Sequence, residues 1–275
     1  MNIKFPYLQD SHATFTYLSK IYPFTEYDLS GKSLLGKDIP ILHIGTGDTV
    51  ILMIAGANAN DRISEPILLQ FATDFCEMAA KERTVFGLNC AVACQTRRLL
   101  ILPCMNPDGK ELSLFGADPG CPLYERQLRQ NNMKSDFSNW KGNARGVLPQ
   151  WNFNDNFAKR REPSVTGEFP ESEPECAFVS RLVKTLSPSL VLECSLGESD
   201  AIYTNCPDTV EQISNNTNCT LKNDFIPGAP SWFSHAYNAP SLHITLRSQE
   251  LSPISVYNRF KELFFRCLYT LAVHF

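Results

Sequence analysis

Thr49-Val-Ile-Leu-Met-Ile-Ala55 carries the strongest fold signal in this chain, and Gly56-Ala-Asn-Ala-Asn-Asp61 follows it directly. The continuous apolar run predicts a strand that is buried on both faces, and Gly56 marks the turn that ends it. Helical periodicity follows from about Glu65 to Lys81. A buried strand that leads through a polar turn into a helix is typical of an α/β layer.

The same alternation of strands and helices continues from about residue 39 to the end of the chain. Further strands are predicted at residues 39–44, 99–103, 189–194 and 241–246, and further helices at residues 172–185 and 253–272. The strand at 99–103 is followed by Asn106-Pro-Asp-Gly109, which predicts a turn. Residues 110–168 are poor in apolar periodicity and rich in Gly, Asn, Pro and Arg, so they are predicted to form a long irregular loop region over the cleft. We expect a single domain over residues 1–275, with residues 1–30 as an N-terminal extension.

Composition and charge exclude several classes of partner. The 275 residues carry a net charge of −4, which gives no basic face for nucleic acid or for an anionic membrane surface. No apolar stretch approaches the ~20 residues of a spanning helix, and the N-terminus lacks the pattern of a secretory signal. The ten cysteines form no CxxC pair. We therefore expect a cytoplasmic protein with no nucleic-acid or membrane partner.

Five further sequence blocks follow one another along the chain. They are Ser33-Leu-Leu-Gly-Lys-Asp-Ile-Pro40, Ile101-Leu-Pro-Cys-Met-Asn-Pro-Asp-Gly109, Trp140-Lys-Gly-Asn-Ala-Arg-Gly-Val147, Asn152-Phe-Asn-Asp-Asn-Phe157 and Gly167-Glu-Phe-Pro-Glu-Ser-Glu-Pro-Glu175. Together they resemble the zinc carboxypeptidase family, especially the bacterial branch that cleaves γ-D-glutamyl-diamino-acid bonds in peptidoglycan stem peptides. The resemblance implies a three-layer α/β/α sandwich around a mixed sheet, with the site at the carboxyl ends of central strands.

The resemblance places the family's metal ligands at Asn58, Asp61 and Cys194. An asparagine amide is a poor zinc ligand because it is neutral, and aspartate is one methylene shorter than the family's glutamate. Asp61 is also well placed to cap the helix that starts near Ile63. A cysteine thiolate is a good zinc ligand, although a thiol at the end of a buried strand usually packs as a small apolar group.

The catalytic base and the substrate clamp differ from the family as well. Thr245 stands at the position of the base, and a hydroxyl cannot take a proton from water at neutral pH. His243 points to the same face as Thr245, so it either borders the pocket or is a structural histidine. The family's Asn-Arg pair, which grips the substrate carboxylate, aligns with Asn154-Asp155, so a cation is replaced by an anion.

Lys141 and Arg145 keep positive charge near the clamp, where they contact an anionic group of the ligand or are simply solvated. The leading hypothesis is a carboxypeptidase-like protein without a cofactor, which has lost zinc-dependent hydrolysis and keeps a cleft for a peptide, a cell-wall fragment or a protein partner. The alternative is an active metallocarboxypeptidase or γ-D-glutamyl-diamino-acid peptidase with an atypical zinc site at Asp61, Cys194 and His243. A third hypothesis makes Cys194 a nucleophile with His243 as its base.

Overall fold

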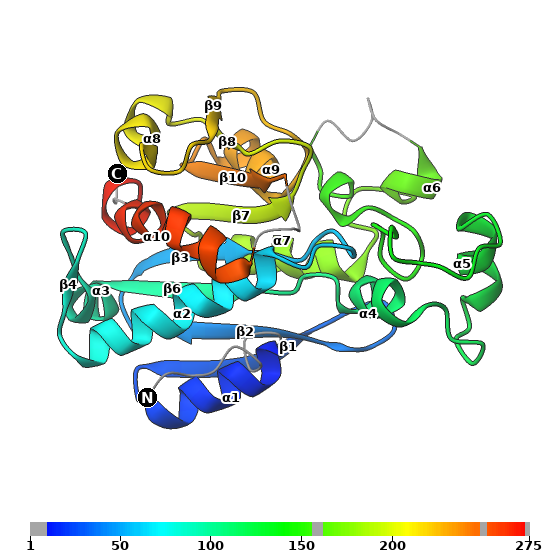
Figure 1. Cartoon of the computed structure of the whole chain (residues 1–275), viewed down its shortest axis with the longest axis horizontal. Coiled ribbons are helices and arrows are strands. Elements are labelled where there is room, and N and C mark those ends of the chain that lie inside the picture. The colour runs from blue at the N-terminus through cyan, green and yellow to red at the C-terminus, as the bar shows by residue number, and fades with distance from the viewer. Residues whose placement is uncertain (1–9, 156–161, 248–251, 273–275) are drawn as a thin grey trace.

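The computed structural model describes residues 10–155, 162–247 and 252–272, and in this part of the chain an eight-stranded mixed sheet forms the centre (Figure 1). Its order is β1-β2-β6-β3-β7-β10-β8-β9. The strands are β1 (Thr25–Lys32), β2 (Asp38–Ile44), β3 (Thr49–Ile54), β6 (Arg97–Leu102), β7 (Leu190–Leu196), β8 (Ala201–Thr204), β9 (Thr220–Lys222) and β10 (Ser241–Leu246). A short hairpin, β4 (Thr84–Val85) and β5 (Leu88–Asn89), lies outside this sheet. The central strands β6, β3, β7 and β10 run parallel to one another.

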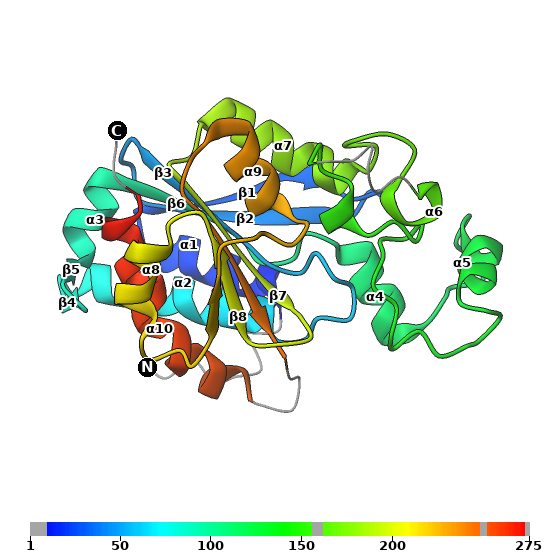
Figure 2. The ribbon, with the colours of Figure 1, turned by 90° about the horizontal axis from the view of Figure 1, so that it is seen from above.

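Helices cover both faces of the sheet (Figure 2). One face packs against α1 (Ser11–Ile21), α2 (Ser64–Ala80), α3 (Cys90–Thr96), α8 (Pro207–Ser214) and α10 (Pro253–Thr270). The other face packs against α7 (Pro174–Leu186) and α9 (Ala229–Tyr237). The predicted three-layer α/β/α sandwich with a mixed sheet is therefore confirmed. Within the described residues, no helix is both long enough and apolar enough to cross a membrane. The cytoplasmic location stays a prediction.

The predicted strands and long helices are found within a few residues of their expected bounds. The run after residue 48 forms β3, whose six residues are all buried, and the helix after it is α2. Of the predicted N-terminal extension, residues 1–30, the described part forms α1 and most of β1, and β1 pairs antiparallel with β2. This part thus contributes most of the edge strand of the main sheet.

The region 110–168 is mostly irregular, with short helices. Beside the sheet lie α4 (Pro107–Phe115), α5 (Tyr124–Gln130), the 3-10 turn η2 (Pro149–Trp151) and α6 (Pro163–Thr166) (Figure 1). The Asn-Pro-Asp-Gly block, expected as a turn, starts α4 instead because the Asn106 side chain accepts from Gly109 N and Pro107 occupies the first turn. Residues 156–161 lie outside the described residues.

Two residues tie the loops together at the carboxyl end of β3. Gly56 has φ +68°, and a Cβ there would lie 2.9 Å from the Cα of Cys104, so the turn requires glycine. Asn106 Nδ2 donates to the carbonyls of Ala57 and Gly142, each at 3.1 Å. The loop after β3 and the loop 140–147 are therefore held against each other beside the sheet.

Candidate functional site

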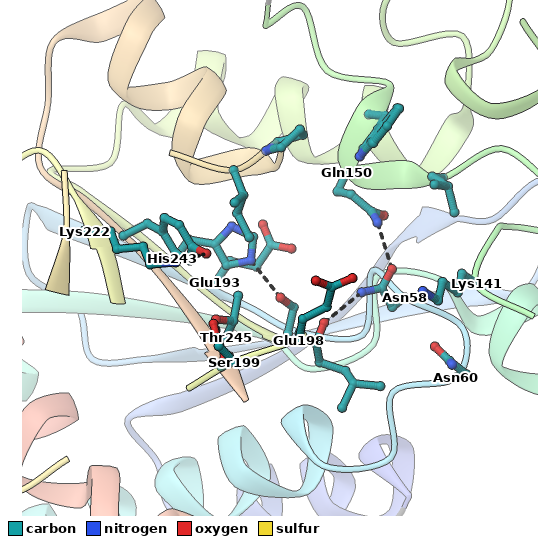
Figure 3. Close-up of a pocket in the computed structure, with 18 residues that line it drawn as sticks. Asn58, Asn60, Lys141, Gln150, Glu193, Glu198, Ser199, Lys222, His243 and Thr245 are labelled. Atoms are coloured by element: carbon teal, nitrogen blue, oxygen red, sulfur yellow. Dashed lines mark hydrogen bonds between the residues drawn. The ribbon is translucent and has the colours of Figure 1, made fainter. Parts of the chain in front are cut away.

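A pocket of about 480 Å³ opens at the carboxyl ends of β7 and β10 (Figure 3). Its walls come from the loop after β3, the loop 141–151, the segment after β7, and the segment before α9. The lining residues are Asn58, Asn60, Lys141, Leu148, Gln150, Trp151, Glu193, Ser195, Leu196, Gly197, Glu198, Ser199, Tyr203, Lys222, Ile226, Pro227, His243 and Thr245. The pocket therefore lies where open α/β sheets generally bind ligands.

Asn58 lines this pocket and is held by its neighbours on both sides. Its Nδ2 donates to the carbonyl of Leu196 at 3.3 Å, and its Oδ1 accepts from Gln150 Nε2 at 2.8 Å (Figure 3). The amide oxygen therefore already has a protein donor, which leaves it still weaker as a metal ligand.

Asp61 is buried and is not among the residues that line the pocket. Its Oδ1 accepts from the backbone N–H groups of Ile63 (2.9 Å) and Ser64 (3.0 Å), which caps α2. Its Oδ2 accepts from Ser64 Oγ at 2.6 Å and from Leu196 N at 2.8 Å. Both oxygens are thus committed to protein donors, and the carboxylate joins the start of α2 to the end of β7.

Cys194 does not face the pocket. It belongs to the core cluster that the sheet shares with α2 and α10, together with its strand neighbour Leu192. Because side chains alternate along a strand, the neighbours Glu193 and Ser195 point to the opposite face and line the pocket. Burial raises the pKa of the Cys194 thiol well above its usual value, so the thiolate is disfavoured. The structure does not bring Cys194 together with His243, as the atypical zinc site and the thiol mechanism both require.

His243 lies on the floor of the pocket, only 2% exposed. Its Nε2 is 2.8 Å from Ser195 Oγ, whereas its buried Nδ1 has no hydrogen-bond partner among the described residues. Burial lowers the pKa of this imidazole to about 3, so the ring is neutral at physiological pH. Thr245 lies on the same face and donates to the carbonyl of Ser199 at 2.7 Å.

Glu193 is the buried carboxyl group of the floor. It is the register partner of His243 on the neighbouring parallel strand, and it accepts from Ala229 N, at the start of α9, at 3.1 Å. Burial raises the pKa of Glu193 to about 8, and the nearby Asp61 carboxylate adds to this effect. The floor therefore combines a neutral imidazole with a carboxyl group that is mostly protonated at pH 7.

Of the residues predicted to form the substrate clamp, only some line the pocket. Lys141 lines the pocket, whereas Arg145 pairs with Glu173 at 3.2 Å. Asn154 is exposed and outside the lining. Asp155 is buried and accepts from Ser231 Oγ, and one of its oxygens lies 2.8 Å from His235 Nδ1. Asp155 thus fastens the loop to α9 and does not face the ligand space.

Sequence reasoning missed Glu193, Ser195, Gln150 and Lys222 as pocket residues. The two strand residues had a usable signal, since the period-two alternation of β7 that buries Leu192 and Cys194 in one face presents Glu193 and Ser195 on the other. Gln150 and Lys222 lie in irregular or short segments without such a pattern.

A sequence model of the family described as zinc carboxypeptidase, peptidase M14, matches residues 13–239. The chain belongs to the zinc carboxypeptidase family. The resemblance drawn from the sequence blocks is thereby confirmed.

A curated relative is the γ-D-glutamyl-L-diamino acid endopeptidase 1 of Lysinibacillus sphaericus, 29% identical over 187 residues. The match covers 64% of this chain and 46% of that protein, so the chain spans about half of the relative's length. Among solved structures, thrombin-activatable fibrinolysis inhibitor has a TM-score of 0.73 at 15% identity and covers 96% of this chain and 73% of its own. The murein-tripeptide amidase MpaA of Escherichia coli O157 has a TM-score of 0.56 at 19% identity and covers 92% of this chain and 93% of its own. These two structures show the fold.

The family implies a zinc ion, and the residues at the site do not fit one. Catalytic zinc takes three protein ligands. Asn58 offers a neutral amide, both oxygens of Asp61 are occupied, and the group that faces the pocket at the end of β7 is the Ser195 hydroxyl, within hydrogen-bonding distance of His243. Among the described residues, no cluster of three or more His, Cys, Asp or Glu side chains is arranged to hold a metal ion.

Proposed function

We propose that the protein is a zinc carboxypeptidase homologue that binds a short peptide in this pocket without zinc-dependent hydrolysis. The proposal rests mainly on Asp61. Its two oxygens accept four hydrogen bonds that cap α2 and hold the end of β7. If Asp61 bound zinc, it would lose these hydrogen bonds, and the free energy of unfolding of the protein would fall.

The chemistry of the lining supports a peptide as the ligand. Amide groups of Asn58 and Asn60 match the donors and acceptors of a peptide backbone, and Trp151 and Tyr203 offer ring surfaces. Lys141 and Lys222 stand exposed at the rim, where they favour a carboxylate. The names of the Lysinibacillus relative and of the Escherichia coli amidase motivate a peptidoglycan stem peptide as the first ligand to try.

The rival hypothesis of an active zinc enzyme receives less support from this geometry. A site built from Asp61, Cys194 and His243 needs these side chains on one face of the sheet, but Cys194 packs against α2 and α10 while His243 lines the pocket. The same separation disfavours Cys194 as a nucleophile activated by His243.

The proposal is tested with the tripeptide L-Ala-γ-D-Glu-L-Lys. We expect calorimetric binding that is unchanged by EDTA, and an intact peptide by mass spectrometry after prolonged incubation with added zinc. Replacing both rim cations, Lys141→Ala with Lys222→Ala, weakens binding, whereas Lys184→Ala, an exposed lysine of α7 outside the pocket, does not. Cleavage of the peptide that EDTA abolishes overturns the proposal.

A further inference from the structure

We propose that Glu193 and His243 together form a site for a positively charged amino group of the ligand, on the floor of the pocket. The inference rests on the proposed function, because it assigns one chemical group of the bound peptide to one part of the pocket. Both side chains belong to neighbouring central strands, β7 and β10, and they are register partners on the same face (Figure 3).

The first observation is the unpartnered nitrogen of His243. Nδ1 is buried and has no hydrogen-bond partner among the described residues, and a buried polar atom left unpaired lowers stability. When Nε2 carries the ring proton and donates to Ser195 Oγ, Nδ1 presents a lone pair. A ligand N–H donor satisfies it.

The second observation is the position of the Glu193 carboxyl group next to that nitrogen. A Cβ placed on Gly228 would lie 2.9 Å from Glu193 Oε2 and 3.1 Å from His243 Nδ1, so both atoms border the same point below the segment that enters α9. Gly228 has φ 161°, an extended conformation that any residue adopts, so the missing side chain is not required by the backbone. The absence of a Cβ keeps both atoms uncrowded.

The chemistry of the floor favours a cation. Glu193 is an acid and burial keeps His243 neutral, while Lys141 and Lys222 are exposed at the rim. An ammonium group donates to a carboxylate and to a neutral imidazole at once, and it is repelled by neither. An anionic group would be repelled by the Glu193 carboxylate.

The test compares N-acetyl-L-Ala-γ-D-Glu-L-Lys with N-acetyl-L-Ala-γ-D-Glu-L-norleucine, so that the side-chain ammonium of lysine is the only amino group in either peptide. The lysine peptide is expected to bind about 10-fold or more tightly, as for a charge-assisted hydrogen bond. Isothermal titration calorimetry at pH 7 measures both affinities. Glu193→Gln and Gly228→Ala are each expected to remove the preference, the second by crowding both atoms.

The outcomes separate this inference from the proposed function. Equal affinity for the two peptides overturns the amino-group site and leaves peptide binding standing. Failure of both peptides to bind overturns the proposed function and, with it, this inference. Circular dichroism confirms that Glu193→Gln is folded, and Gly228→Ala provides an independent variant that leaves the carboxyl group in place.

Discussion

At the scale of single residues, the end of β7 shows how one position changes the interpretation of a whole site. Cys194 was aligned with a zinc ligand, but it points into the core, whereas Ser195 points into the pocket, with its Oγ 2.8 Å from His243 Nε2. Because side chains alternate along a strand, residues 194 and 195 point to opposite faces of the sheet. A ligand placed at residue 194 cannot reach the pocket that residue 195 lines.

A rebuilt metal site tests this assignment. Asn58→His with Asp61→Glu and Ser195→His is expected to bind zinc, because residues 58 and 195 both line the pocket. The matched variant, with Cys194→His in place of Ser195→His, is expected to bind none and to be less stable, since it buries an imidazole in an apolar cluster. Mass spectrometry for metals measures both, and zinc retained by the Cys194→His variant contradicts the assignment.

Asp61 is predicted to be a structural residue. Asp61→Ala removes the cap of α2 and leaves Leu196 N without its acceptor, so we expect a loss of about 2–4 kcal/mol in the free energy of unfolding. Asp61→Asn keeps an acceptor oxygen and is expected to lose about half as much. Urea denaturation measures both. Unchanged stability of Asp61→Ala would show that these bonds are not needed.

At the scale of elements, the loop before residue 156 is fastened to α9 by one carboxylate. Asp155 is buried and accepts from Ser231 Oγ, and one of its oxygens lies 2.8 Å from His235 Nδ1, whose side chain is 59% exposed. A cation stands at this position in the family's clamp, but here the residue holds the wall of the pocket in place.

Substitutions at the two ends of this contact should differ in their effect on stability. Asp155→Ala is expected to cost about 2–4 kcal/mol, because it removes a buried carboxylate and leaves the buried Ser231 hydroxyl unpaired. His235→Ala removes only an exposed partner and is expected to cost about 1 kcal/mol or less. Thermal unfolding in parallel is the measurement, and an equal cost for the two changes argues against the role given to Asp155.

The helices and strands differ in how well they could be predicted from the sequence. β3 and α2 were predictable because a buried apolar run and a helical period are long local signals. The last two strands of the sheet, β8 and β9, have four and three residues, too few to establish a period. The sequence predicts a turn where α4 begins, because Asn-Pro-Asp-Gly suits both a turn and a helix start. The hydrogen bond from Gly109 N to Asn106 Oδ1 decides in favour of the helix start.

At the scale of the whole molecule, two buried groups set opposite limits on stability. The pKa of Glu193 is about 8 in the folded protein against an ordinary 4.5, so its contribution is complete below about 4.5 and is lost as the pH rises to about 8. The pKa of His243 is about 3 against an ordinary 6.5, so its contribution is lost as the pH falls from about 6.5 to about 3. Burial also raises the pKa values of Glu65 and Glu175, which adds to the alkaline limit.

Stability is therefore expected to peak between about pH 4.5 and pH 6.5 and to fall on both sides. Each titrating group contributes a slope of about 1.4 kcal/mol per pH unit. Glu193→Gln is expected to flatten the alkaline side by one such slope, and His243→Gln the acidic side. Urea denaturation from pH 3 to pH 9 gives both profiles. Slopes that neither substitution alters would contradict the burial of these groups.

The candidate site was predictable only in part, for a physical reason. The sequence shows that the family's donor types are missing at residues 58, 61 and 194, because residue identity alone decides whether a side chain binds zinc well. It does not show what the replacements contact. The bonds from Gln150 to Asn58 and from Leu196 to Asp61 join residues 92 and 135 positions apart, and only the folded chain brings them together.

The absence of a zinc site in this pocket is tested by the zinc content of the purified protein. The protein is produced with zinc in the medium, purified without chelator or added metal, and its zinc per chain is measured by mass spectrometry. The structure predicts a content well below one zinc per chain, unchanged by Asn58→Ala and by Ser195→Ala. One zinc per chain that either substitution removes would contradict the account.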